Sequence, residues 1–251
     1  MIASLMMYQR PQLAGAHDRF WALIRTELAA TGIDAPDHLS QDADEFSVWK
    51  SPDLVLSQTC GMPYRLWLHD QVGLVGTPDY GLKDCPPGFY RSALVVRATD
   101  ARTELTAFKD ATFAFNEAFS QSGFAAPYHH TGAIGSWFQN RVRTGAHLLS
   151  AKAVAEGRAD IAALDAVTWR NIERYGDIAQ DLRVLDWTVP TPGLPLITAA
   201  RQDAGLIYGA VRRAIDALSV QDAADLGMRG IVAIPKQAYL AVPNPPRGDQ
   251  S

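Results

Sequence analysis

The chain has 251 residues, of which 47% are hydrophobic and 20% are charged. This composition is ordinary for a globular protein with a large core, and it excludes collagen-like and disordered classes. The formal net charge of −4 gives no broad basic surface, so we expect no nucleic-acid partner and only a local anion site. The sequence also contains no apolar run near the roughly 20 residues that a membrane-spanning helix needs.

The first part of the chain predicts strands that alternate with helices. Residues 2–8 are apolar but lack a basic leader and are too short for a signal peptide, so they predict a buried strand. They indicate a mature chain or one without an export signal. A helix is predicted from Leu13 to Leu28, where apolar residues recur at helical spacing after Pro11. The apolar run at 54–57 predicts the next strand.

The middle of the chain continues this alternation. Two more strands are predicted at 72–75 and 93–96, separated by a long loop rich in Gly and Pro. A short helix is predicted at 103–108 and a further strand at 112–116. The polar residues at 120–123 are of the types that begin a helix.

The last part of the chain completes the pattern. Its predicted elements are a helix at 145–158, strands at 161–164, 184–189 and 194–198, a helix at 204–218 and a disordered tail from Pro243. Strands that alternate with helices over short connections favour α/β layers with parallel sheets. In such sheets ligands bind beyond the carboxyl ends of the strands. The polar residues at those ends are Gln58, Thr59, Asn116, Ser120, Ser122 and Asp165.

Seven short stretches occur in an order that is more specific than any one of them alone. They are 57–63 (SQTCGMP), 90–92 (YRS), 113–116 (FAFN) with 120–123 (SQSG), 145–147 (GAH), 153–160 (AVAEGRAD) and 165–169 (DAVTW). In this order they resemble the PhnD-like substrate-binding proteins of phosphate and phosphonate ABC transporters. The resemblance extends over most of the chain, from about residue 7 to residue 198.

The resemblance implies a type II periplasmic-binding-protein fold, in which two α/β lobes are joined by crossover strands and hold a ligand in a cleft between them. We expect a discontinuous first lobe of residues 1–100 and 195–251, with residues 101–194 inserted as the second lobe. The crossover strands are expected at 93–99 and 194–200.

The same resemblance implies a monomeric binding protein that captures a small anionic ligand, such as a phosphonate or phosphate, for an ABC transporter permease. No enzymatic chemistry, cofactor or metal is then expected. The resemblance implies the periplasm, although the sequence shows no signal peptide and the cytoplasm remains open. The alternative is a ligand sensor or a cofactor-biosynthesis enzyme on the same fold, with Cys60 and His147 as nucleophile and base.

The strongest candidates for oxyanion binding are Ser120, Gln121, Ser122 and Gly123. They begin a predicted helix, where unpaired N–H groups and the helix dipole favour an anion. Simple N-capping by Ser is the alternative. His147 also begins a helix and can donate to an oxyanion, or it is an ordinary surface histidine.

The remaining candidates are polar residues near other strand ends. Asp165 can accept a hydrogen bond from a ligand amine or cap the helix that follows it. In the other lobe, Tyr8 can supply an amphipathic wall and Arg91 a bidentate clamp for an oxyanion, although Arg91 also fits a surface ion pair. Gln58 and Thr59 offer neutral hydrogen-bond groups at a strand-to-helix turn, or serve the turn alone.

Two histidines and two cysteines are the remaining candidates for a metal site or a disulfide. His129 and His130 are adjacent and would point to different faces of a helix, so we do not expect a metal site there. Cys60 and Cys85 are predicted to form a disulfide that closes a loop of about 26 residues and stabilises the fold by roughly 3 kcal/mol. Two separate thiols are the alternative.

Overall fold

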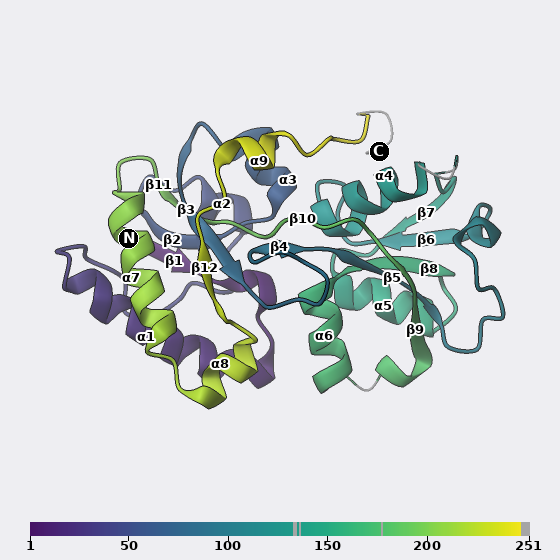
Figure 1. Ribbon diagram of the computed structural model, residues 1–251, viewed down its shortest axis with the longest axis horizontal. Coiled ribbons are helices and arrows are strands. Elements are labelled where there is room, and N and C mark those ends of the chain that lie inside the picture. The colour runs from purple at the N-terminus through teal and green to yellow at the C-terminus, as the bar shows by residue number, and fades with distance from the viewer. Residues whose placement is uncertain (133–134, 136, 177, 247–251) are drawn as a thin grey trace. The chain divides into compact units, whose positions relative to one another are not determined.

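The computed structural model describes residues 1–132, 135, 137–176 and 178–246 (Figure 1). Contacts between Cα atoms divide the chain into two compact units. The first unit combines Met1–Phe89 with Pro192–Ala241, and the second combines Tyr90–Thr191 with the described C-terminal residues 242–246. The chain passes from one unit to the other within β4 (Phe89–Tyr90) and within β10 (Thr191–Pro192), which pair with each other.

The first unit contains a five-stranded sheet in the order β1-β2-β11-β3-β12. Its strands are β1 (Ile2–Ser4), β2 (Leu54–Gln58), β3 (Val72–Asp79), β11 (Leu196–Ala199) and β12 (Gly230–Val232). Its helices are η1 (Met6–Tyr8), η2 (Pro11–Leu13), α1 (Ala14–Ala29), α2 (Glu45–Trp49), α3 (Gly61–Pro63), η3 (Tyr64–Leu68), α7 (Ala204–Asp216), α8 (Val220–Leu226) and α9 (Lys236–Leu240). β1 is parallel to β2, and β11 is antiparallel to both β2 and β3. The carboxyl ends of β1, β2 and β3 therefore lie at one edge of the sheet.

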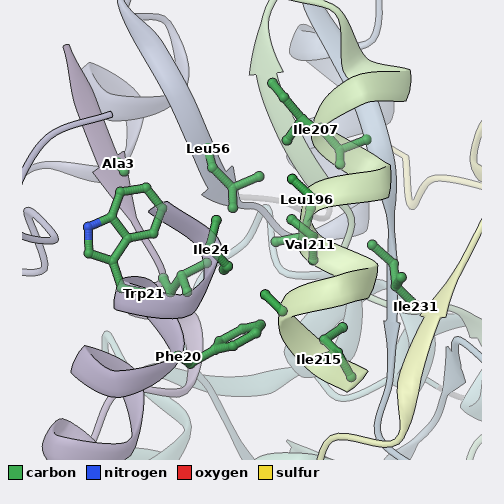
Figure 2. Packing of buried hydrophobic residues seen from close by; sticks show 14 of the residues in the cluster. Ala3, Phe20, Trp21, Ile24, Leu56, Leu196, Ile207, Val211, Ile215 and Ile231 are labelled. Atoms are coloured by element: carbon green, nitrogen blue, oxygen red, sulfur yellow. The ribbon is translucent and has the colours of Figure 1, made fainter. Parts of the chain in front are cut away.

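The main core of the first unit lies between its sheet and the helix pair α1 and α7 (Figure 2). Phe20 and Ile24 project from one face of α1 because residues four apart lie on the same side of a helix. Ile207 and Val211 repeat this spacing on α7, and Leu56 of the sheet belongs to the same hydrophobic cluster. Burial of each of these side chains contributes about 1.5–3 kcal/mol.

The second unit contains a five-stranded sheet in the order β7-β6-β8-β5-β9. Its strands are β5 (Ser92–Arg97), β6 (Thr112–Phe115), β7 (Asn140–Arg143), β8 (Ile161–Asp165) and β9 (Leu182–Trp187). Its helices are η4 (Leu105–Phe108), η5 (Gln121–Ala125), α4 (Ala126–Gly132), α5 (His147–Ala155), α6 (Ala166–Tyr175) and η6 (Ala179–Asp181). β6 is parallel to β7 and β8, whereas β5 is antiparallel to β8 and β9. The carboxyl ends of β6, β7 and β8 thus share an edge with the start of β5.

The division into units differs from the lobe boundaries that we expect from the sequence. Residues 90–100, expected in the first lobe, belong to the second unit because β5 pairs along its length with β8 and β9. Residues 192–194, expected in the second lobe, belong to the first unit, and residues 242–246, expected in the first lobe, belong to the second unit. The two expected crossover strands are β5 and β11, which lie inside the two large sheets. The predicted disordered tail falls in part on residues 247–251, which lie outside the described residues.

Candidate functional site

The carboxyl edge of the second sheet gathers most of the candidate residues. β6 leads into Asn116 and the loop to η5, β7 leads into the turn before His147, and β8 ends at Asp165. Because the three strands are parallel, the polar residues that follow them meet at this edge. The candidate residues that follow β6, β7 and β8 therefore all belong to the second unit.

Ser120 is the N-cap of the helix that begins with the π-helix η5 and continues directly into α4. The Ser120 Oγ accepts a hydrogen bond of 3.0 Å from the Gly123 N–H. The Ser120 carbonyl accepts from the N–H groups of Phe124 and Ala125. The capping role of Ser120 is thus present, and the Gly123 N–H donates to Ser120. The N–H of Ser122 precedes the first intrahelical hydrogen bond, as expected at a helix start.

Ser122 and His147 form a hydrogen-bonded pair at this helix start. The Ser122 Oγ lies 3.0 Å from His147 Nε2, and His147 Nδ1 lies 3.2 Å from the Ala163 carbonyl oxygen. Because a carbonyl only accepts, Nδ1 carries the ring proton, and Nε2 of the neutral ring accepts from the Ser122 hydroxyl. The Ser92 Oγ donates to the Ser122 carbonyl at 2.8 Å and ties η5 to the start of β5.

Burial lowers the pKa of His147 to about 4, and the hydrogen bond to the Ala163 carbonyl offsets only part of that effect. The residue is half-buried as a whole, yet the imidazole is neutral at neutral pH. The ring is confined by Gly123, since a Cβ atom at that position would lie 3.1 Å from His147 Cε1 and 1.9 Å from Asn116 Oδ1. Asn116 Oδ1 is buried and has no hydrogen-bond partner within the described part of the chain.

The lowered pKa of His147 makes the protein less stable in weak acid. Between pH 6.5, the ordinary pKa of histidine, and pH 4, the unfolded chain binds a proton at His147 that the folded chain does not. We expect the free energy of unfolding to fall across this window by up to about 3 kcal/mol through this residue. His147→Asn keeps a donor for the Ala163 carbonyl but does not titrate, so it should remove that part of the pH dependence.

Urea unfolding of the wild type and of His147→Asn at pH 7 and pH 4.5 measures this effect. Burial also lowers the pKa of His17, so a common decrease in both proteins is expected and the difference between them is the test. An identical pH dependence in the two proteins would contradict the assignment of a buried, neutral His147.

Asp165 and Arg91 have partners of their own within the second unit. Asp165 is buried, and its Oδ1 accepts from the N–H groups of Val167 and Thr168 at 2.7 and 3.1 Å. The predicted capping role of Asp165 is therefore present. The guanidinium of Arg91 lies over the Trp187 ring, 4.4 Å from its centroid. We expected Arg91 in the same lobe as Tyr8, but it belongs to the second unit because it directly precedes β5.

The first unit has its own group of polar residues at the carboxyl edge of its sheet. The Gln58 Nε2 donates to the Tyr80 hydroxyl and to the Leu194 carbonyl, both at 3.2 Å. Tyr8 packs edge to face against Tyr80, with ring centroids 5.2 Å apart. The Thr59 hydroxyl is fully buried and has no hydrogen-bond partner among the residues that the structure describes. A buried hydroxyl of this kind is a candidate for a bound ligand or water.

Tyr80 is a residue of this group that sequence reasoning missed. The predicted strand ended at Val75, because Gly76 and Pro78 are typical of a loop. In the structure β3 continues to Asp79 and delivers Tyr80 to the sheet edge. The sequence feature that could have identified Tyr80 is an aromatic residue directly after a strand, where ligand sites are expected.

The predicted disulfide is wrong: Cys60 and Cys85 are thiols. Cys60 follows β2 and is buried, whereas Cys85 lies in the loop after β3. Strand β11 lies between β2 and β3, so the strands that precede the two cysteines are not neighbours in the sheet. A disulfide needs Cα atoms within about 7 Å, and closeness in the chain order does not supply that distance.

Two further sequence hypotheses concern Cys60 with His147 as a catalytic pair and His129 with His130 as a metal site. Cys60 belongs to the first unit and His147 to the second, and both ring nitrogens of His147 bond within the second unit. The His130 Nε2 lies 2.8 Å from Asp186 Oδ2. Over the described residues, three or more His, Cys, Asp or Glu side chains do not gather in a way that could hold a metal ion.

Comparison with known families identifies the chain. A sequence model described as ABC transporter, phosphonate, periplasmic substrate-binding protein matches residues 68–238. The chain belongs to this family. The match contains the helix start at η5, His147 and Asp165, so the phosphonate-binding family resemblance predicted from the sequence is confirmed. No curated protein sequence matches the chain.

Solved structures show that this phosphonate-binding family member has the type II periplasmic-binding-protein fold, as predicted. PhnD1 from Prochlorococcus marinus, in complex with methylphosphonate, is 15% identical and has a TM-score of 0.71 over 95% of this chain and 94% of its own. A binding protein component of an ABC phosphonate transporter from Pseudomonas aeruginosa is 15% identical, with a TM-score of 0.68 over 95% and 82%. XAC2383 from Xanthomonas citri, bound to ATP, is 15% identical, with a TM-score of 0.68 over 94% and 91%.

Family membership assigns the protein to a class of periplasmic substrate-binding proteins that serve ABC transporters, and it confirms this predicted function class. The family is one of transport proteins rather than of enzymes, with a small ligand and a permease as partners. None of the described helices has both the length and the apolar character needed to cross a membrane.

Proposed function

We propose that this protein captures a small oxyanion-bearing ligand, a phosphonate or a phosphate-like ion, for an ABC transporter permease and releases it unchanged. The observation that carries the proposal is the Ser122–His147 pair beside the start of η5, at the carboxyl edge of the second sheet. Membership of the phosphonate-binding family supports the same ligand class.

The physical basis of the proposal is a set of neutral hydrogen-bond groups. The first N–H groups of a helix and its dipole attract an anion without a full positive charge. The Ser122 hydroxyl and the neutral His147 ring add polar atoms beside that helix start. The predictions that Gln121, Gly123 and Asp165 also contact the ligand stay predictions.

The ligand contacts that we predict from the first unit also stay predictions. Tyr8, Gln58 and Thr59 are the proposed contacts, and the buried hydroxyl of Thr59 supports its inclusion. The predicted contact between Arg91 and the ligand also stays a prediction. The Arg91 guanidinium stacks on Trp187, within the second unit.

We favour a binding protein over an enzyme because of the chemistry of His147. A general base works best when its pKa is near the operating pH, whereas burial lowers the pKa of His147 to about 4. Ser122 next to such a ring is a weak nucleophile at neutral pH. We further propose that the protein acts as a monomer in the periplasm and, given its net charge of −4, without a nucleic-acid partner.

Ser122→Ala tests the proposal against simple capping. The variant should bind methylphosphonate about 5- to 150-fold more weakly, because an oxyanion loses a partner worth about 1–3 kcal/mol. The ligand-free protein loses the hydrogen bond from Ser122 to His147 Nε2 but keeps its helix cap, so its free energy of unfolding should fall by no more than about 1 kcal/mol. Isothermal titration calorimetry with methylphosphonate and with inorganic phosphate gives the affinities, and calorimetric melting gives the stabilities.

Ser120→Ala is the matched variant, because it removes the N-cap two residues earlier on the same helix start. We expect it to lower the free energy of unfolding by about 1 kcal/mol and to weaken ligand binding less than Ser122→Ala does. Unchanged affinity in Ser122→Ala, combined with lost stability, would reject the site.

A further inference from the structure

The Ser122–His147 pair holds a single proton that it can offer to a ligand. The Nδ1 proton of His147 is directed at the Ala163 carbonyl, which can only accept. Between Ser122 Oγ and His147 Nε2, which lie 3.0 Å apart, there is then one hydroxyl proton for two acceptor atoms. In the unliganded protein this proton is donated by Ser122 to Nε2.

This proton count constrains how the pair meets an oxyanion. If the Ser122 hydroxyl keeps donating to Nε2, the Oγ atom presents only lone pairs to the ligand. If the hydroxyl turns to the ligand, the lone pairs of Oγ and of Nε2 face each other across 3.0 Å. In both arrangements a fully deprotonated ligand leaves one buried acceptor opposite another acceptor, which is unfavourable.

The pair does not readily gain the missing proton from solution, because its surroundings favour the neutral ring. Burial is the largest cause of the low pKa of His147, the Ala163 carbonyl acts in the opposite direction, and no charged side chain of the described chain is among the causes. Gly123 packs against the ring and confines it in this position.

The elements packed on α5 carry several charged or titratable groups. α5 packs against β5, β6, β8, β9 and α6. These groups are Arg97, Lys152, Asp165, Arg170, Glu173, Arg174, Tyr175, Arg183 and Asp186. Those with known partners are directed elsewhere: Arg97 and Arg183 bond carbonyls near the other end of β5, Asp165 caps α6, and Asp186 pairs with His130.

We infer that the site binds its oxyanion with one proton still attached, as the monoanion of a phosphonate or as a hydrogen phosphate, and discriminates against sulfonate and sulfate. The P–OH group of the ligand donates to whichever of Ser122 Oγ and His147 Nε2 lacks a donor. The inference rests on the proposed function, since it specifies the charge state of the ligand at the same site. Sulfonates have the same shape but carry no proton at neutral pH.

Calorimetry with matched ligand pairs tests the inference. At pH 6, methanesulfonate should bind at least about 100-fold more weakly than methylphosphonate, and sulfate correspondingly more weakly than inorganic phosphate, because a site with an unpaired acceptor rejects a ligand without the donor. Above the second pKa of methylphosphonate, its Kd should rise about tenfold per pH unit. Titrations in buffers of different ionisation enthalpy should show uptake of about one proton per ligand at pH 8.5 and none at pH 5.5.

His147→Gln tests whether His147 sets the preference for a protonated ligand or only supports the fold. The glutamine amide has both a donor and an acceptor, so it can offer an N–H to a deprotonated oxygen. We expect the preference for methylphosphonate over methanesulfonate to fall at least about tenfold in this variant and the proton uptake at pH 8.5 to disappear. His38→Gln, at an exposed position, is the control and should bind as the wild type does.

The possible outcomes distinguish failure of the protonated-ligand inference from failure of the proposed function. Binding of methanesulfonate within about tenfold of methylphosphonate at pH 6 overturns the inference and leaves the proposed function in place. An unchanged ligand preference in His147→Gln, with both ligands weakened equally, also overturns it. If neither methylphosphonate nor phosphate binds at millimolar concentration, the proposed function and the inference fall together.

Discussion

Replacing Gly123 with alanine is expected to weaken the binding of methylphosphonate by about 5- to 150-fold. The added Cβ would lie 1.9 Å from Asn116 Oδ1 and 3.1 Å from His147 Cε1, so the helix start, the asparagine or the imidazole must move. Overpacking of this kind costs about 1–3 kcal/mol, and 3 kcal/mol corresponds to about 150-fold in affinity. Calorimetric titration measures the affinity, and circular dichroism checks that the variant folds.

Two further variants make the result of Gly123→Ala specific. Gly132→Ala adds the same methyl group near the end of the same helical segment, where no atom lies within 4 Å, and should bind as the wild type does. Adding Asn116→Ala to Gly123→Ala removes the closest clash and should recover part of the affinity. Wild-type affinity in Gly123→Ala would show that the ligand does not bind at this helix start.

Ile24→Ala is expected to cause a large loss of stability in the first unit. Ile24 is fully buried on α1, where it faces the sheet and α7 (Figure 2). Truncating a buried isoleucine to alanine costs about 2–5 kcal/mol, through lost transfer free energy and the cavity that remains. Urea unfolding measures the loss, and the ligand affinity of the folded variant should stay close to that of the wild type.

Thr26→Ala is the matched control for Ile24→Ala. Thr26 lies on the exposed side of the same helix, so its truncation should change the free energy of unfolding by no more than about 0.5 kcal/mol. A similar loss in both variants would mean that α1 is not anchored by its apolar face. The comparison therefore tests the core directly rather than the helix propensity of α1.

The sequence predicted the parts of the fold that depend on local patterns. Apolar runs with polar residues at their ends located β2, β6 and β8, and parallel strand ends brought Asn116 and Asp165 to one edge. Small polar residues predicted the helix start at Ser120. The two interpretations of that helix start, N-capping and anion binding, both depend on its first N–H groups. Such features are determined by hydrogen-bonding rules within a few residues of the chain.

Features that depend on pairing between distant segments were not predictable in the same way. The direction of β5 depends on its partners β8 and β9, so the sequence assigned this strand and Arg91 to the other lobe. β7 was missed because three of its four residues are polar and none of them is fully buried. The partners of His147, a hydroxyl and a backbone carbonyl, leave no trace in sequence spacing.

The position of β11 between β2 and β3 has a consequence for the order in which the two sheets can be completed. All five strands of the second sheet have been synthesised once Trp187 has emerged, whereas the first sheet still lacks β11 and β12 at that point. Until residues 196–199 arrive, the neighbouring edges of β2 and β3 have no strand between them. The sheet of the second unit can therefore form from one continuous segment of the chain, while the sheet of the first unit is completed only when the residues near the C-terminus are present.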